Sequence, residues 1–141
     1  MEAQFVDTNI FLRHLTNDHP EKAKACFELF KKAARDEVSL VTADWVIAEI
    51  IYVMSGKKTY NLPPEEIKNR LKPILAVRGI KLDNKDVVMR ALDLYSQYKI
   101  DYPDCLGIAF LEYQQLKEIY SYDQDFDRVE TITRLEPEMG S

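Results

Sequence analysis

Short apolar runs alternate with longer stretches of helical periodicity along the whole chain. The apolar runs are too short for helices and cover residues 4–6, 38–41, 79–82, 118–121 and 131–133. The longer stretches repeat apolar residues every three or four positions and cover residues 9–15, 20–34, 43–55, 61–76, 86–98 and 101–116. Strands that alternate with helices favour a mostly parallel sheet with helices on both faces. The sequence therefore predicts a three-layer α/β fold with four to five short strands.

The composition suits a single globular domain. The chain has 141 residues, of which 46% are hydrophobic, and this is enough for one core. We expect one domain over residues 1–135 and a disordered tail over residues 136–141. No apolar run is long enough to cross a bilayer, and the N-terminus lacks the basic start and apolar stretch of a signal peptide. The expected compartment is the cytoplasm.

The cysteine and charge content argues against several classes of protein. Cys26 and Cys105 have no CxxC spacing, which predicts buried reduced thiols rather than a disulfide or a zinc site. The net charge of −5 disfavours a general nucleic-acid coating protein, because such proteins are usually basic. Basic residues gather at Lys31-Lys32, Arg35 and Lys57-Lys58. They are either solvated helix ends or a rim that faces RNA.

Four acidic residues lie beside apolar runs in four separate parts of the chain: Asp7, Glu49, Asp104 and Asp123. A carboxylate at the end of a buried strand is costly to leave unpaired, because its charge is withdrawn from water. Several carboxylates together repel one another until protons or a cation relieve the repulsion. Hard divalent ions prefer oxygen ligands and catalyse phosphate cleavage and transfer. Ligands of parallel sheets bind beyond the carboxyl ends of the strands, where Asp7 and Asp123 are expected. The pattern predicts a metal-dependent nuclease.

Each of these acids also has a structural explanation. Asp7-Thr8-Asn9 consists of favoured helix caps, so this segment alone does not decide between capping and metal binding. Glu49 lies in a helix that is apolar on nearly all sides, so we expect it to be buried, either in a salt bridge or in a carboxylate cluster. Asp101 fits the N-cap of the helix that follows, which puts Asp104 near the positive helix end. Asp123 could cap a short helix after its strand.

The same segments, in this order and spacing, resemble the PIN-domain family, and within it the toxin subunits of VapBC-type toxin–antitoxin pairs. Residues 7–13 are similar to the family's opening strand and DTN motif, and Glu49 matches its helical acid. Residues 101–109 resemble its D-F-x-D-A-x-x-A-A segment, and residues 121–126 resemble its T-x-D-x-D-F segment. Cys105 and Gly107 depart from this pattern. Ser121 replaces the usual Thr and keeps the hydroxyl group.

The resemblance implies a three-layer PIN-like fold and a Mg²⁺- or Mn²⁺-dependent endoribonuclease. Asp7, Glu49, Asp104 and Asp123 would be the catalytic residues and would hold one or two ions. The residues that would orient these ligands are Thr8, Asn9, Ser121 and Asp125. The resemblance also implies an RNA substrate, a homodimer, and a cognate antitoxin that inserts a C-terminal segment, often with an Arg, into the acidic groove.

Two other functions remain open from the sequence. The first is a non-catalytic PIN-like module that binds RNA or protein, and the complete set of four acids argues against it. The second is a phosphatase or phosphotransferase with Asp7 as its nucleophile. That chemistry usually needs a second acid two positions later, where this chain has Asn9.

Overall fold

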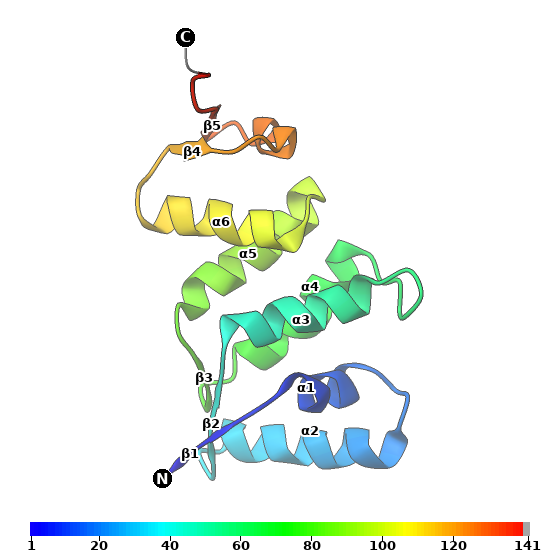
Figure 1. Ribbon diagram of the computed structural model, residues 1–141. Helices are drawn as coiled ribbons and strands as arrows, with labels where there is room; N and C mark the ends of the chain where they lie inside the picture. Colours follow the sequence, from blue (N-terminus) through cyan, green and yellow to red (C-terminus); the bar gives the residue numbers. More distant parts are fainter. Residues whose placement is uncertain (140–141) are drawn as a thin grey trace.

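The computed structural model describes residues 1–139 and contains the expected succession of strands and helices (Figure 1). The strands are β1 (Ala3–Phe5), β2 (Ser39–Thr42), β3 (Ile80–Leu82), β4 (Glu118–Tyr120) and β5 (Thr133–Leu135). The helices are α1 (Thr8–Leu15), α2 (Pro20–Ala34), α3 (Asp44–Ser55), α4 (Pro64–Leu75), α5 (Lys85–Tyr98), α6 (Tyr102–Tyr113) and the short 3₁₀ helix η1 (Gln124–Arg128). The elements lie within a few residues of their predicted positions. The start of α4, expected at residue 61, and the end of α6, expected at residue 116, differ by three residues, and β5, expected at residues 131–133, lies two residues later.

Local sequence explains where several helices begin. The Asp7 side chain caps α1 and accepts a hydrogen bond from the Thr8 amide at 2.7 Å. Pro20 occupies the first turn of α2, where a missing amide proton costs nothing. Asp101 is the N-cap residue of α6 as predicted, although its side chain makes no capping hydrogen bond. The helix starts therefore follow from short-range chemistry.

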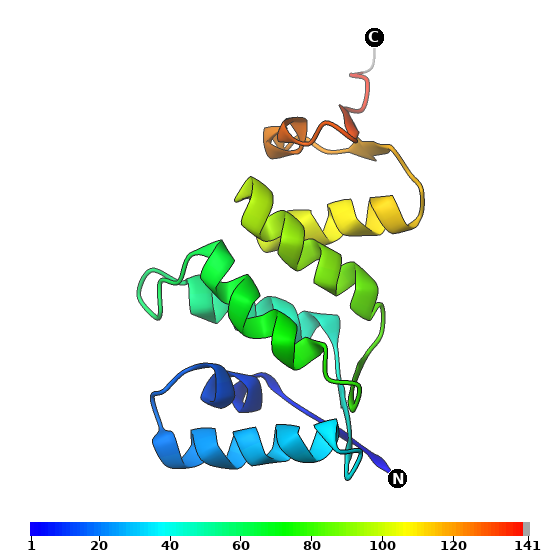
Figure 2. The same ribbon diagram turned by 180° about the vertical axis from the view of Figure 1, so that it is seen from behind.

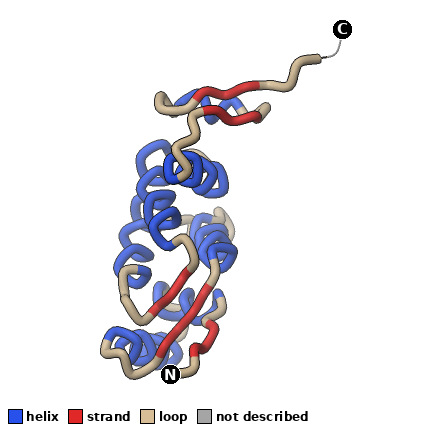
Figure 3. The backbone as a smooth tube through the Cα atoms, turned by 90° about the vertical axis from the view of Figure 1, so that its left-hand side faces the viewer, coloured by secondary structure: helices blue, strands red, loops and turns tan. Residues whose placement is uncertain are grey.

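The five strands form two separate parallel sheets. The first has the order β1-β2-β3, and the second is the pair β4-β5. Figures 1 and 2 show the two sheets at opposite ends of the molecule, with α5 and α6 between them. Figure 3 shows the same separation from the side. The carboxyl ends of β1 and β4, which were expected to meet, therefore belong to different sheets.

One apolar core joins α1 to α6. Its largest fully buried side chains include Phe11, Leu40, Ile47, Met54, Leu71, Leu92 and Ile108. The backbone at Gly79 approaches α2 so closely that an added Cβ would lie 2.1 Å from the Ala33 carbonyl oxygen. Only glycine fits this contact between α2 and the start of β3. Cys26 and Cys105 are buried free thiols, as predicted.

The molecule exposes more surface than a compact domain of its size. Its accessible area is 9118 Å², whereas a compact monomer of 16.5 kDa exposes about 7,600 Å². The first strand was expected to be buried over residues 4–6, but only Val6 is buried, while Gln4 and Phe5 are exposed and Phe5 is 55% exposed. Within residues 1–139, no strand pairs with the outer edge of β1. An open strand edge beside exposed aromatic side chains is a surface on which another segment or molecule can pack.

The C-terminal part of the chain follows β5 without regular secondary structure over residues 136–139. Residues 140–141, which belong to the predicted tail, lie outside the described residues. The boundary at residue 135 stays a prediction. In the described part of the chain, no helix combines the length and hydropathy required to span a bilayer.

Candidate metal centre

Three carboxylates meet between the start of α6 and the segment after β4. One oxygen atom from each of Asp104, Asp123 and Asp125 lies within 4.8 Å of the others. Asp104 is the third residue of α6, while Asp123 and Asp125 lie at the start of η1. A hard divalent ion holds its oxygen ligands at about 2.0–2.6 Å, so ligand oxygens on one ion lie within about 5 Å of each other. The spacing and chemistry of the three oxygens therefore fit such an ion.

Backbone hydrogen bonds give the segment after β4 its shape. The Ser121 hydroxyl oxygen accepts a hydrogen bond from the Asp123 amide at 3.0 Å. Asp123 Oδ1 in turn accepts a hydrogen bond from the Asp125 amide at 2.9 Å. Asp123 thus caps η1, as its structural explanation proposed, and it still offers a carboxylate oxygen to the group. Capping and ligand binding are compatible at this residue.

The carboxylate of Asp125 lies in the three-carboxylate group, which was not predicted from the sequence. Asp125 was expected only to orient the ligands, yet its own carboxylate belongs to the group. The sequence feature that could have indicated this is the position of Asp125 only two residues after Asp123. The Asp123 cap of η1 keeps these two residues close together. Arg128 lies 3.8 Å from Asp125, but both side chains are largely exposed, so this ion pair compensates little of the negative charge.

The pKa of Asp104 is raised from 3.8 to about 6. Burial is the largest cause, and the charge of Asp123 and a hydrogen bond with that carboxylate follow. The charges of Asp101 and Asp125 raise the pKa further. Without a cation, Asp104 therefore keeps its proton to a higher pH than an ordinary carboxyl group and loses it near pH 6. A divalent ion would relieve the same repulsion and displace that proton.

We expect Mn²⁺ to bind more weakly as the pH falls below about 6. The Asp104 proton must leave before the carboxylate can coordinate an ion, so the apparent affinity should fall by up to about tenfold per pH unit. Because the pKa of Asp104 is raised in the folded protein, its protonated carboxyl group stabilises the metal-free protein in acid. This stabilisation is lost as the pH rises through about 6. Calorimetric titration with Mn²⁺ at pH 5.0, 6.0 and 7.5 measures the effect. An affinity that does not change over this range would contradict the expectation.

The other two predicted acids form a second group at α1 and α3. The hydroxyl of Thr8, which is 5% exposed, donates a hydrogen bond to Glu49 Oε2 at 2.8 Å. The amide of the same Thr8 bonds to Asp7, so this one residue links both acids. Within the described residues, neither Asp7 nor Glu49 joins the carboxylates of the first group. Asn9 is exposed and lies beside Arg13 in a different hollow.

Glu49 is exposed, so the prediction that it is buried was wrong. α3 is apolar on nearly all sides in sequence, but two of its largest apolar side chains, Trp45 and Tyr52, lie on the solvent side with Glu49. The opposite side of α3 faces the core with Val46, Ile47, Ile50, Ile51 and Met54. None of the ion pairs found in residues 1–139 includes Glu49, so the salt bridge considered for it does not form there.

A groove of about 510 Å³ lies beside Glu49, between α3 and the start of α6. Its walls come from α3 and from the start of α6, and they include Glu49, Tyr52, Ser55, Asp101, Tyr102 and Pro103. Pro103 directly precedes Asp104 in α6, but none of the three clustered carboxylates is among the residues that line the groove. Tyr102 is buried, and in the described part of the chain its hydroxyl has no hydrogen-bond partner. Burial raises the pKa of this hydroxyl well above its usual value.

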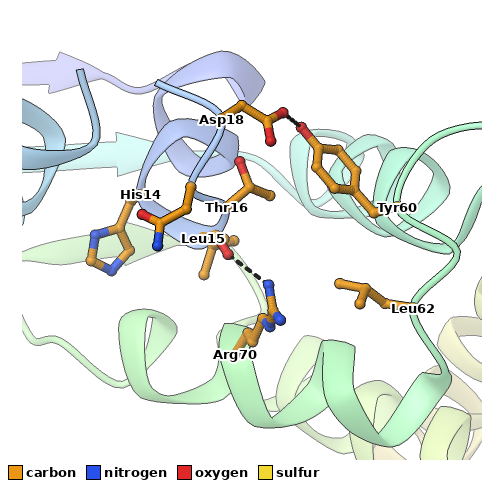
Figure 4. Close-up of a pocket in the computed structure, with 8 residues that line it drawn as sticks. His14, Leu15, Thr16, Asp18, Tyr60, Leu62 and Arg70 are labelled. Carbon is orange, nitrogen blue, oxygen red and sulfur yellow. Dashed lines mark hydrogen bonds between the residues drawn. The ribbon is translucent and has the colours of Figure 1, made fainter. Parts of the chain in front are cut away.

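A larger cavity, of about 580 Å³, lies away from both groups. Figure 4 shows it between the α1–α2 connection and α4. The Tyr60 hydroxyl donates a hydrogen bond to Asp18, and the Arg70 guanidinium donates one to the Leu15 carbonyl at 3.0 Å. Because these polar groups satisfy one another, we assign no catalytic role to this cavity.

Comparisons with known proteins agree with the predicted family. Residues 5–132 match the family model described as the PIN domain. The chain is 23% identical over 126 residues to a VapC ribonuclease of Aquifex aeolicus, and the match covers 89% of this chain and 91% of that protein. It also matches the solved structure of VapC20 from Mycobacterium tuberculosis, a Sarcin-Ricin loop cleaving toxin, with 13% identity, a TM-score of 0.36 and coverage of 93% and 97% of the two chains. Since the family model spans most of the sequence and all four predicted acids, this protein belongs to the PIN domain family.

Proposed function

We propose that this protein is a metal-dependent endoribonuclease. The observation that carries the proposal is the meeting of Asp104, Asp123 and Asp125 in a chain of the PIN domain family, where burial and the charge of Asp123 raise the pKa of Asp104. The similarity to a VapC ribonuclease supports RNA as the substrate. A non-catalytic binding module is the second candidate, but such a module has no need for carboxylates that repel one another.

The residues present fit a Mg²⁺ or Mn²⁺ ion, and Asp104, Asp123 and Asp125 would hold it. A bound ion supplies an activated water molecule and neutralises charge on the scissile phosphate. Glu49 is exposed and could accept a proton, while the Thr8 hydroxyl holds one of its carboxylate oxygens in place. Ser121 orients the backbone of Asp123. Hydrolysis of this kind leaves a 5′-phosphate and a 3′-hydroxyl on the RNA.

All four predicted acids can serve one ion only if the two sheets come together. Asp7 follows β1 and Asp123 follows β4, so parallel pairing of these two strands would bring both acids to the same end of one five-stranded sheet. β1 has an open edge for such pairing among the described residues. The excess of about 1,500 Å² of accessible surface over a compact monomer would be partly buried by this closure. We propose that the closed arrangement is the active one, with Asp7 and Glu49 completing the site.

Cleavage of single-stranded RNA should require both a divalent ion and the acids. We expect cutting in Mg²⁺ or Mn²⁺, none in EDTA, and a loss of roughly 100-fold or more for Asp7→Asn. The matched control is Asp127→Asn, because this neighbouring acid accepts a hydrogen bond from Arg134 and lies outside the carboxylate group. The measurement is the rate of product formation on a labelled oligonucleotide. Equal rates with metal, with EDTA and with Asp7→Asn would rule out the proposed enzyme.

We further propose that the protein is the toxin of a toxin–antitoxin pair that acts in the cytoplasm as a homodimer. The similarity to VapC proteins supports this role, and an acidic groove suits an arginine side chain of an antitoxin. Induced expression should slow growth, and co-expression of the antitoxin should restore it. Normal growth at high expression would count against the toxin role and would leave the nuclease activity untouched.

A further inference from the structure

The exposed face of α3 carries two aromatic side chains, one on each side of Glu49. Trp45 is 57% exposed and Tyr52 is 80% exposed. The positions are separated by four and three residues, so all three side chains lie on one face of the helix. The two aromatic residues lie about 10 Å apart along the helix axis. Large apolar side chains gathered on one exposed face mark a binding surface.

The ring of Trp45 is supported by a second aromatic ring. Phe5 of β1 stacks on it, with ring centroids 5.9 Å apart and an angle of 26° between the ring planes. This contact restricts the rotamers of Trp45 before any ligand binds, which lowers the entropic cost of binding. Phe5 and Trp45 thus form one exposed aromatic surface in the arrangement that the structure describes.

The charges near this face select the kind of partner. Asp44 and Glu49 lie along α3, and the exposed Lys57 and Lys58 follow its C-terminal end. The aromatic row is therefore followed in the chain by two exposed cations, and Tyr52 also borders the groove that Glu49 and Asp101 line. Aromatic side chains stack bases of single strands, and lysines bind phosphate groups. A protein partner would match the aromatic row but has no particular need for the two lysines.

We propose that single-stranded RNA runs along this face of α3, with bases stacked on Trp45 and Tyr52 and a phosphate group at Lys57 and Lys58. The inference rests on the proposed nuclease function, because a strand bound here lies beside Glu49, one of the proposed site residues. Double-stranded RNA does not fit this surface, since its bases are already stacked within the helix. Trp45 and Tyr52 are thus positioning residues that select unpaired RNA.

The fluorescence of Trp45 can test this directly, because it is the only tryptophan in the chain. We expect a short single-stranded RNA to quench it in EDTA at low salt, where no cleavage occurs, and the corresponding duplex to leave it unchanged. Tyr52→Leu should bind the single strand roughly 5-fold or more weakly. The matched control is Tyr113→Leu, which removes an exposed tyrosine of α6 and should keep the wild-type affinity. Fluorescence anisotropy of a labelled oligonucleotide should show tighter binding to Trp45→Phe than to Trp45→Leu.

The possible results separate this inference from the proposed function. Absence of quenching, or equal affinity of Tyr52→Leu and wild type, overturns the inference, and the nuclease proposal still stands if the protein cuts RNA in Mn²⁺. A blue shift of the Trp45 emission with rising protein concentration, in the absence of RNA, also overturns it, because a second copy then covers the face. Saturable quenching that depends on Tyr52 supports the inference even if cleavage in Mn²⁺ fails.

Discussion

Replacing Asp104 with Asn should lower RNA cleavage by roughly 100-fold to 1,000-fold and should stabilise the metal-free protein at pH 7.5. The substitution removes a proposed ion ligand, so activity falls. It also removes the repulsion among Asp104, Asp123 and Asp125, because Asn resembles the protonated carboxyl group but carries no charge. Cleavage assays in Mn²⁺ and thermal melts in EDTA measure the two effects.

The pH dependence of the melting temperature makes this prediction specific. The pKa of Asp104 in the folded protein is about 6, above its ordinary value, so wild type carries the destabilising charge at pH 7.5 and is largely protonated at pH 5. The gain in stability from Asp104→Asn should therefore be present at pH 7.5 and should shrink at pH 5. Asp83→Asn, an exposed substitution before α5, is the control for general charge effects. If Asp104→Asn lost both activity and stability, Asp104 would have a structural role instead.

Binding of Mn²⁺ together with a short RNA should make the molecule more compact. The radius of gyration should approach about 14 Å, the value for a compact domain of 141 residues. The physical reason is that an ion shared by Asp7, Glu49, Asp104 and Asp123 requires β4 to come alongside β1, which removes an open strand edge and buries exposed surface. Small-angle X-ray scattering measures the change, and the forward scattering gives the molecular mass, so dimerisation can be recognised.

The matched control for closure is Asp123→Asn, which should stay extended under the same conditions because it lacks one of the proposed ligands. Asp127→Asn should close like wild type, since its carboxylate is engaged with Arg134. A wild-type protein that cuts RNA in Mn²⁺ while its radius of gyration does not change would contradict the closure. In that case the group of Asp104, Asp123 and Asp125 would have to act without Asp7.

The helices could be predicted well because their signals are local. The segment predicted at residues 20–34 is found as α2 (Pro20–Ala34), since proline at the first position and apolar residues at helical spacing define it within a few residues. The strands were harder, because runs of three or four residues carry little periodicity. β5 lies at Thr133–Leu135 rather than at residues 131–133, since strand limits depend on pairing with β4.

Burial could be predicted less well than secondary structure. The first strand was expected to be buried, but β1 lies at the edge of its sheet, and its three residues are exposed. Glu49 was expected to be buried because its neighbours in α3 are apolar. Hydropathy does not reveal that Trp45 and Tyr52 lie on the outer face, and an exposed tryptophan has the same weight in a sequence pattern as a buried one.

The sequence by itself determined the order and type of the elements and the membership of the PIN domain family, because periodicity, helix caps and motif spacing are properties of neighbouring residues. Only the tertiary structure decided which acids meet. It brings Asp125 together with Asp104 and Asp123, and it links Asp7 to Glu49 through Thr8 in a second group. The reason is that these contacts depend on how distant strands and helices pack, and a short strand carries too little information to choose its own partner.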